Sequence, residues 1–130
     1  MSLDVSPQLL ADAENGAVRE EDFVQTVRTS LPYAYDLIAR LAGELHAGPA
    51  EFADNQTPPP SEKERGQLLR ALSSDAIRGS LERHFGVVLA FQNCHRVAAF
   101  RPEARGGETH ARFTSLRSQI LNQSPEFRDC

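Results

Sequence analysis

Four histidines are the side chains of this sequence best suited to metal binding or proton transfer, but they are widely spaced. None of them lies within ten residues of another. Metal-binding histidines usually occur in close pairs or together with paired cysteines. The sequence therefore predicts no metal site and solvated or helix-terminal roles for the four: His46, His84, His95 and His110.

The adjacent pair Cys94-His95 is the nearest approach to a thiol–imidazole couple. In a strand, neighbouring side chains point to opposite faces, so these two could not interact directly. A buried cysteine acting as a small hydrophobic residue is the simpler interpretation. Lys63 is the sole lysine and has charged neighbours, unlike the desolvated amine that a Schiff base needs. We expect no nucleophile and no cofactor.

The better candidates for binding are polar residues in one loop and on one strand. Asp54 lies in the middle of the segment 52–57, just before Pro58, Pro59 and Pro60. A polar loop on a stiff support can present hydrogen-bonding groups to a ligand, although residues 54 and 55 could equally cap turns. Arg96 and Arg101 flank a predicted strand and could hold a carboxylate, or could be surface arginines with no specific partner.

Length and charge limit the class of protein. The chain has 130 residues, of which 40% are hydrophobic and 25% charged, as in an ordinary globular domain spanning residues 1–130. A net charge of −4 argues against a general nucleic-acid binder. The longest apolar stretch, Gly86–Phe91, is too short for a membrane span. The first residues have no basic start and no apolar core, which predicts a cytoplasmic protein rather than a secreted one.

The elements that must position the candidate residues are mostly helices. Ser6-Pro7 begins a short helix, and an apolar stripe runs from about Glu20 to Ala47. Pro32 interrupts this stripe, which predicts a kink or a break near Thr29 to Leu31, and Ser30 could then cap the second half. Residues 50–60 read as a loop. Ser61 with Glu64 forms a capping box at the start of the next helix, and residues 73–75 begin another that ends at Gly86.

A change of period after Gly86 predicts a hairpin. Val87–Phe91 and Cys94–Phe100 are short apolar runs separated by Gln92-Asn93, and asparagine tolerates the positive φ of tight turns; a continued helix is the alternative. A last helix is expected over His110–Asn122, with Phe113, Leu116, Ile120 and Leu121 inward. The fold class is thus mainly α (α+β), with about five helices and one hairpin.

Three segments resemble the small lysinoalanine-forming enzymes of cinnamycin- and duramycin-type lanthipeptide (lantibiotic) biosynthesis. They are Phe23–Ala34, Phe52–Arg65 (FADNQTPPPSEKER) and His84–Arg101 (HFGVVLAFQNCHRVAAFR). The resemblance implies an intramolecular aza-Michael addition of a peptide lysine amine to dehydroalanine. It also implies an intertwined homodimer, no cofactor, and a hydroxylated aspartate of the substrate as the base. The protein would then act by positioning the reacting groups of the peptide, which can lower the activation barrier by roughly 7–11 kcal/mol.

On this interpretation the partner is a modified lanthipeptide precursor with thioether rings and dehydroalanine. We place the peptide between the 54–57 loop and the hairpin, with Arg96 or Arg28 meeting a carboxylate. The expected substrate-binding residues are Asp54, Asn55, Gln56, Phe91, Gln92, Asn93, Arg96, Arg28 and Tyr33.

Two other functions stay open. A non-catalytic peptide-binding or chaperone-like module of a biosynthetic pathway would have the same sequence features, because a mould needs no catalytic signature. A small regulator with a helix-turn-helix over Ser61–His84 is the third, although the acidic balance disfavours DNA.

Overall fold

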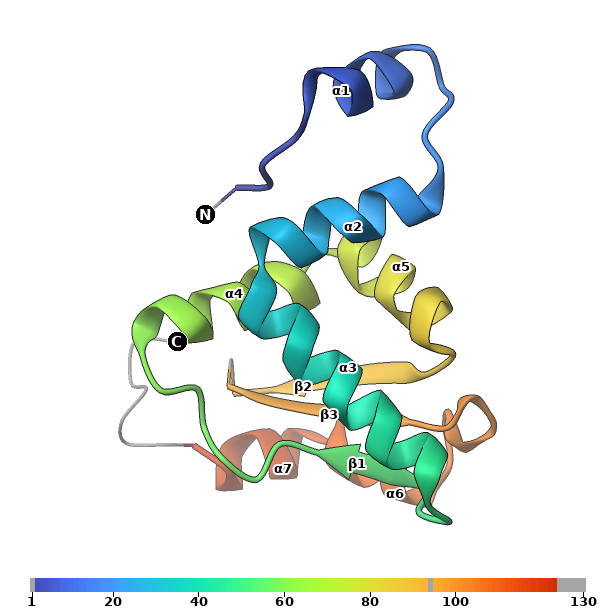
Figure 1. The fold of residues 1–130 in the computed structure, drawn as a ribbon. Coiled ribbons are helices and arrows are strands. Elements are labelled where there is room, and N and C mark those ends of the chain that lie inside the picture. The colour runs from blue at the N-terminus through green and yellow to red at the C-terminus, as the bar shows by residue number, and fades with distance from the viewer. Residues whose placement is uncertain (1, 94, 124–130) are drawn as a thin grey trace.

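The computed structural model describes residues 2–93 and 95–123 and forms a small α+β fold (Figure 1). The mainly helical class is confirmed, with seven helices in the described residues rather than about five. The elements in chain order are α1 (Pro7–Glu14), α2 (Glu20–Ser30), α3 (Pro32–Ala47), β1 (Phe52–Asp54), α4 (Glu62–Leu72), α5 (Asp75–Phe85), β2 (Val88–Gln92), β3 (Arg96–Phe100), a 3-10 turn (Pro102–Ala104), α6 (Glu108–Phe113) and α7 (Leu116–Leu121). None of the helices in the described part of the chain has the length and apolarity to cross a membrane.

Pro32 divides the long apolar stripe into two helices, as the sequence predicts. Helix α2 ends at Ser30 and α3 begins at Pro32. The predicted cap by Ser30 is wrong, because its Oγ accepts a hydrogen bond from the Asp4 amide at 2.8 Å. A distant glutamine takes the capping role: Gln67 Oε1 accepts from the amides of Tyr33 (2.7 Å) and Ala34 (3.2 Å).

The N-cap signals after residue 60 predict the starts of both helices correctly, but only one of the two predicted capping serines bonds a backbone amide. Ser61 is the N-cap of α4, yet its hydroxyl bonds the Glu64 carboxylate rather than a backbone amide. Ser74 caps α5 through the Ile77 amide at 3.3 Å. Gly86 ends α5 with φ of 67°, the left-handed conformation that favours glycine.

The segment predicted to be a loop contributes a third strand. Strand β1 pairs antiparallel with β3, with Phe52 opposite Phe100, and the sheet order is β1-β3-β2. A strand of three residues is too short to show alternation in sequence, so its pairing with β3 rather than its own pattern defines it.

The hairpin is confirmed with its turn shifted by one residue. Gln92 still belongs to β2 and pairs with Arg96, and Asn93 and His95 lie in the turn. Asn93 adopts φ of 56°, which makes it the one non-glycine residue with positive φ among the described residues. The predicted start of the second strand, Cys94, lies outside the described residues.

The predicted last helix is wrong in two respects. It breaks into α6 and α7 at Thr114 and Ser115, where the Ser115 hydroxyl caps α7 through the Ser118 amide at 3.1 Å. Three apolar residues expected inside instead face solvent: Leu116, Ile120 and Leu121.

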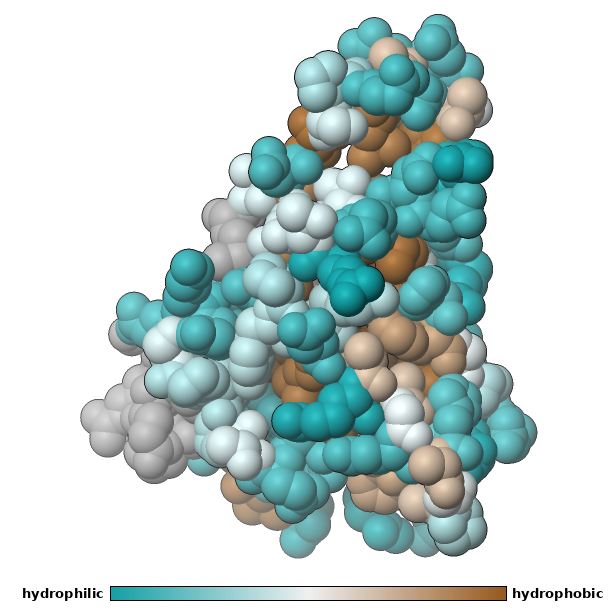
Figure 2. Space-filling model, viewed as in Figure 1, coloured by the Kyte–Doolittle hydropathy of each residue, from teal (hydrophilic) through white to brown (hydrophobic). Residues whose placement is uncertain are grey.

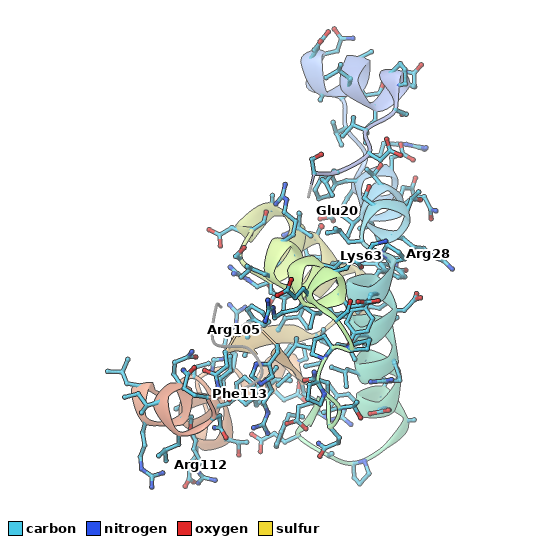
Figure 3. All side chains as sticks on the ribbon, turned by 90° about the vertical axis from the view of Figure 1, so that its left-hand side faces the viewer. Glu20, Arg28, Lys63, Arg105, Arg112 and Phe113 are labelled. Atoms are coloured by element: carbon cyan, nitrogen blue, oxygen red, sulfur yellow. The ribbon has the colours of Figure 1, made fainter. Side chains whose placement is uncertain are left out.

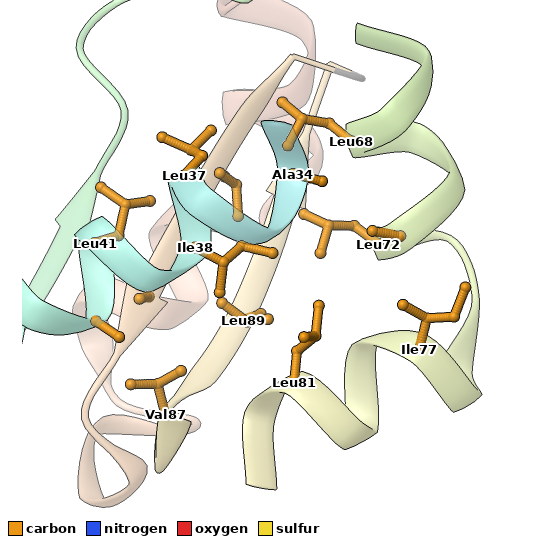
Figure 4. Packing of buried hydrophobic residues seen from close by; sticks show 14 of the residues in the cluster. Ala34, Leu37, Ile38, Leu41, Leu68, Leu72, Ile77, Leu81, Val87 and Leu89 are labelled. Carbon is orange, nitrogen blue, oxygen red and sulfur yellow. The ribbon is translucent and has the colours of Figure 1, made fainter. Parts of the chain in front are cut away.

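The two faces of the sheet are covered differently. Helices α3, α4 and α5 pack on one face, where Ile38, Leu81 and Leu89 belong to the main core (Figure 4). The other face carries Ala90, Ala98 and Phe100 and is covered by α6. Figure 2 shows that hydrophobic side chains reach the surface in this view only as separate patches, one of them between α1 and α2.

Candidate functional site

The predicted binding residues converge at the end of the sheet where the hairpin turns. Antiparallel pairing places Asp54, the last residue of β1, opposite Ala98 of β3. Arg96 begins β3 and lies opposite Gln92, the last residue of β2. Residues separated by some forty positions in sequence therefore share one edge of the molecule.

An ion pair ties β1 to β3 at this end. Arg96 Nη2 lies 2.6 Å and Nε 3.1 Å from Asp54 Oδ2, and Gln56 Nε2 donates to Asp54 Oδ1 at 2.7 Å. The Asp54 side chain is 8% exposed, so the carboxylate is largely removed from water while fully hydrogen-bonded. The carboxylate predicted to meet a ligand anchors the loop, and Arg96 already holds a carboxylate of its own chain.

Asn55 extends the ladder beyond β1 with its side chain. Its Oδ1 accepts from the Val97 amide at 2.9 Å, and its Nδ2 donates to the His95 carbonyl at 2.8 Å. The side chain is thus buried and imitates a further residue of paired strand. This arrangement holds His95 and Val97 against the loop 54–57.

Gln92 and Asn93 connect the hairpin to the C-terminal helices. Gln92 Nε2 donates to the Phe113 carbonyl at 2.8 Å. The Asn93 amide donates to Gln119 Oε1 at 3.4 Å, and Asn93 Nδ2 donates to the Asn122 carbonyl. Among the residues that the structure describes, Gln92 Oε1 is the one buried side-chain polar atom without a hydrogen-bond partner.

Two hollows adjoin Arg96. The first, of about 240 Å³, lies between the loop and the hairpin and is lined by Asn55, Gln56, Pro58, His95 and Arg96. The second, of about 340 Å³, lies on the α6 side of the sheet and is lined by Phe52, Gln92, Arg96, Thr109, Arg112, Phe113, Ser118 and Asn122. The first occupies the place where sequence reasoning put a bound peptide.

Tyr33 lines a third hollow, of about 510 Å³, on the other side of Pro58. Its further lining residues include Asp36, Arg40 and Thr57. Partial burial raises the pKa of the Tyr33 phenol, because desolvation disfavours the charged form, so Tyr33 is a neutral donor here. Since Pro58 borders the first and third hollows, the proline segment forms the ridge between them.

Two predicted residues do not join this group. Phe91 points to the opposite face of the sheet from Gln92 and packs against the main core. Arg28 lies on α2 over the ring of Tyr35, 5.4 Å from its centroid, at a distance from Arg112 and Phe113 that Figure 3 makes plain.

Several residues of the site were not identified from the sequence. Phe113 lies under the Arg96 guanidinium, 5.6 Å from its carbon to the ring centroid, and stands on the sheet side of α6 (Figure 3). Phe52 stacks on Phe100 with ring centroids 5.2 Å apart. Alternation along β3 could have placed Arg96 and Phe100 on one face, but no local signal pairs α6 with that face. Arg101, for which the sequence left open a carboxylate partner or no specific partner, donates to the carbonyls of Leu45 (2.7 Å), Ala50 (2.8 Å) and Gly48.

The chemistry that this arrangement can supply is hydrogen bonding and aromatic contact. The arrangement offers amide, guanidinium and phenol groups beside aromatic walls, and no three potential metal ligands gather within the described residues. A family model described as "NucS shadow ORF", whose label also carries the letters KH, matches residues 1–130. No curated protein matches the chain. No solved structure matches it either.

Proposed function

The chain belongs to the NucS shadow ORF family, and from this membership and the site geometry we propose that it is a non-catalytic peptide-binding module on a KH-type fold. The observation that carries the proposal is the hollow between residues 55–58 and 95–96, with rigid prolines on one side and an immobilised turn on the other. A pre-organised polar groove of this kind lowers the entropic cost of holding an extended peptide.

The element order supports a KH-type interpretation of the family label. Helices α4 and α5 lie between β1 and the β2–β3 hairpin, in a three-stranded sheet of order β1-β3-β2. Nucleic-acid-binding KH domains clamp the backbone of four nucleotides with a GxxG loop. In that fold the loop joins two consecutive helices, and here the α4–α5 junction reads Ser73-Ser74-Asp75.

This junction is unsuited to gripping phosphates. Side chains replace the glycines that allow close approach, and the Asp75 carboxylate adds a negative charge that Arg78 Nη2 pairs at 2.6 Å. The whole chain carries a net charge of −4. Both features oppose the electrostatic attraction on which nucleic-acid binding depends, which favours a peptide partner.

The family description raises a prior question, namely whether the chain is produced. In its ordinary sense a shadow reading frame overlaps the coding sequence of another gene, so we infer that this frame overlaps that of NucS. Agreement between local signals and tertiary packing favours a sequence that folds: Ser6 and Ser74 cap their helices, and Gly86 is left-handed where α5 ends. Peptide mass spectrometry of cells tests production directly. A stop codon introduced in this frame, chosen to be synonymous in the overlapping NucS frame, removes this protein without changing NucS and so separates the effects of the two proteins.

Binding is tested with the full chain against two probes, a phage-displayed library of linear peptides and a fluorescein-labelled single-stranded oligouridine. We expect enrichment of peptides that compete with one another, with binding weakened by Gln56→Ala, because Gln56 lines the hollow. Gln8→Ala, an exposed glutamine on α1, is the matched control. Salt-dependent binding of oligouridine without peptide enrichment would overturn the proposal.

Lysinoalanine formation stays a prediction that uses the same surface. Its test is incubation with a cyclised precursor that has a free lysine and one dehydroalanine, scored by loss of reactivity toward an added thiol. Protection faster than without protein would make the module an enzyme. Binding with thiol reactivity retained would leave it a binding module.

A further inference from the structure

A buried acceptor without a partner belongs to a residue that lines the hollow on the α6 side of the sheet. Gln92 is 2% exposed and lines this hollow, and its Oε1 has no partner among the described residues. The orientation of the amide is fixed, because the other end of the group bonds a carbonyl, which accepts only from nitrogen. A buried carbonyl oxygen without a partner costs free energy that a ligand N–H can recover.

Positive charge at the rim of the same hollow complements this acceptor. The ion pair of Arg112 with Glu108 (3.1 Å) joins residues one helical turn apart, with side chains that are 69% and 88% exposed. Such surface pairs contribute little, so an incoming carboxylate can compete with Glu108 for the guanidinium. Arg96 is committed to Asp54 and covers Phe113, which leaves Arg112 as the lining arginine open to a ligand.

The ligand's third feature follows from the walls and the neighbouring helix. Phe52 and Phe113 give the hollow an aromatic side. Helix α7 turns polar residues toward the molecule and apolar residues toward solvent, the reverse of an ordinary surface helix. Gln119 contacts the hairpin turn, whereas Leu116 is 83% and Ile120 70% exposed. Contiguous exposed apolar residues of this kind mark interaction surfaces.

We propose that this hollow binds a carboxylate-bearing residue of a peptide, with the residue's N–H donating to Gln92 Oε1, its carboxylate on Arg112 and its apolar part on Phe113. An N–H and a carboxylate joined through one carbon occur at the C-terminal residue of any peptide, and the capture of that group is a recurring mode of recognition. An internal aspartate carries the same two groups with a longer spacing. The site deepens the proposed peptide-binding function and rests on it, because Arg96 borders both hollows.

The test titrates the ¹⁵N-labelled full chain with three small probes and follows the Gln92 side-chain amide by NMR. N-acetyl-phenylalanine represents a C-terminal residue, N-acetyl-phenylalaninamide lacks its carboxylate, and N-acetyl-aspartyl amide carries an internal side-chain carboxylate. We expect the first to shift the Gln92 resonance with an affinity at least about fivefold above that of the amide. Tighter binding of the aspartyl probe would assign the carboxylate to an internal acidic residue and also support the site.

Variants separate this site from the remainder of the surface. Arg112→Gln should weaken N-acetyl-phenylalanine about three- to tenfold, the scale of one charge-assisted hydrogen bond. Arg117→Gln, an exposed arginine on α7 that does not line the hollow, is the matched control and should change nothing. Because Arg112 is on the surface, its variant keeps the fold.

Two outcomes would overturn the inference. Equal affinity for N-acetyl-phenylalanine and its amide would show that the hollow does not recognise the carboxylate. An unshifted Gln92 resonance with all three probes would show that Oε1 bonds water only. Library peptides that still bind near Gln56 in either case would leave the proposed peptide-binding function intact. Absence of any library binding defeats that function without deciding how the small probes behave.

Discussion

The two faces of the small sheet show opposite relations between packing and polarity. On the face covered by α3, α4 and α5, large aliphatic side chains such as Ile38 and Leu81 are fully buried. On the α6 face the strands present Ala90 and Ala98, and the cluster is small. Toward the hairpin end, that second face gives way to amides and arginines around a hollow.

The difference suggests that the face covered by α3, α4 and α5 provides most of the stability, whereas the α6 face carries the polar groups that could contact a ligand. A close-packed aliphatic face fixes the positions of the strands. Among the described residues the thinner face carries one buried side-chain atom without a hydrogen bond, Gln92 Oε1, whereas Oε1 of Gln67 accepts two backbone amides. Incomplete satisfaction on a rigid support is expected of a surface that meets a partner.

The largest expected effect is in the aliphatic face. Leu81→Ala removes a fully buried side chain between α5 and the sheet and should lower the free energy of unfolding by about 2–5 kcal/mol, the transfer and cavity cost of such truncations. Urea denaturation followed by circular dichroism measures it. Leu69→Ala, at a leucine that is 46% exposed, is the control and should cost much less. Equal losses would contradict the distinction between core and surface.

The next effect compares the two buried glutamines. Gln67→Leu leaves the amides of Tyr33 and Ala34 at the start of α3 without their acceptor and should cost about 1–3 kcal/mol. Gln92→Leu removes one bond to the Phe113 carbonyl and also removes the unsatisfied oxygen, so its cost should be smaller. Urea midpoints of the two variants give the order, and a larger loss at Gln92 would show that Oε1 has a partner in solution.

How far the sequence predicted these features depends on whether the signal is local. The helix break before Pro32, the helix start at residues 73–75 and the helix end at Gly86 depend on neighbouring residues, and all three predictions are confirmed. Strand β1 could not be predicted because pairing with β3 defines it. The α3 cap by Gln67 and the anchoring of the α3 C-terminus by Arg101 involve bonds that span 33 to 56 residues, which no local pattern encodes.

The site follows the same rule. The polar residues of the candidate site were proposed because a loop and a turn rich in amides are visible in sequence, but the pairing of β1 with β3 that brings the two together is not. The α6 wall and the outward apolar side of α7 were missed, since the periodicity over residues 110–122 is equally compatible with one continuous inward-facing helix. The capping serine at 115 is the one local sign of the break.

A smaller effect is expected where apolar residues face solvent. Leu116→Gln combined with Ile120→Gln should change the free energy of unfolding by less than about 0.5 kcal/mol, because neither side chain is buried. The same double variant should reduce retention of library peptides if α7 contributes to the partner surface. Strong destabilisation in urea would mean that these side chains pack against something in solution, which would place α7 with the core rather than with the binding surface.

The smallest effect concerns the ion pair of Glu20 with Arg83, which joins α2 to α5. Arg83 Nε donates to Glu20 Oε1 at 2.6 Å, and this bond lowers the pKa of Glu20 below its usual value while raising that of Arg83. A carboxylate with a lower pKa in the folded state stabilises above its unfolded pKa, and this contribution disappears as the pH falls through the folded value. The coupling between Glu20→Gln and Arg83→Gln in a double-mutant cycle should therefore be present at neutral pH and vanish in acid. Because both side chains are exposed, the coupling should also weaken in high salt. A coupling that persists in acid would show that the interaction of these two side chains does not depend on the charge of Glu20.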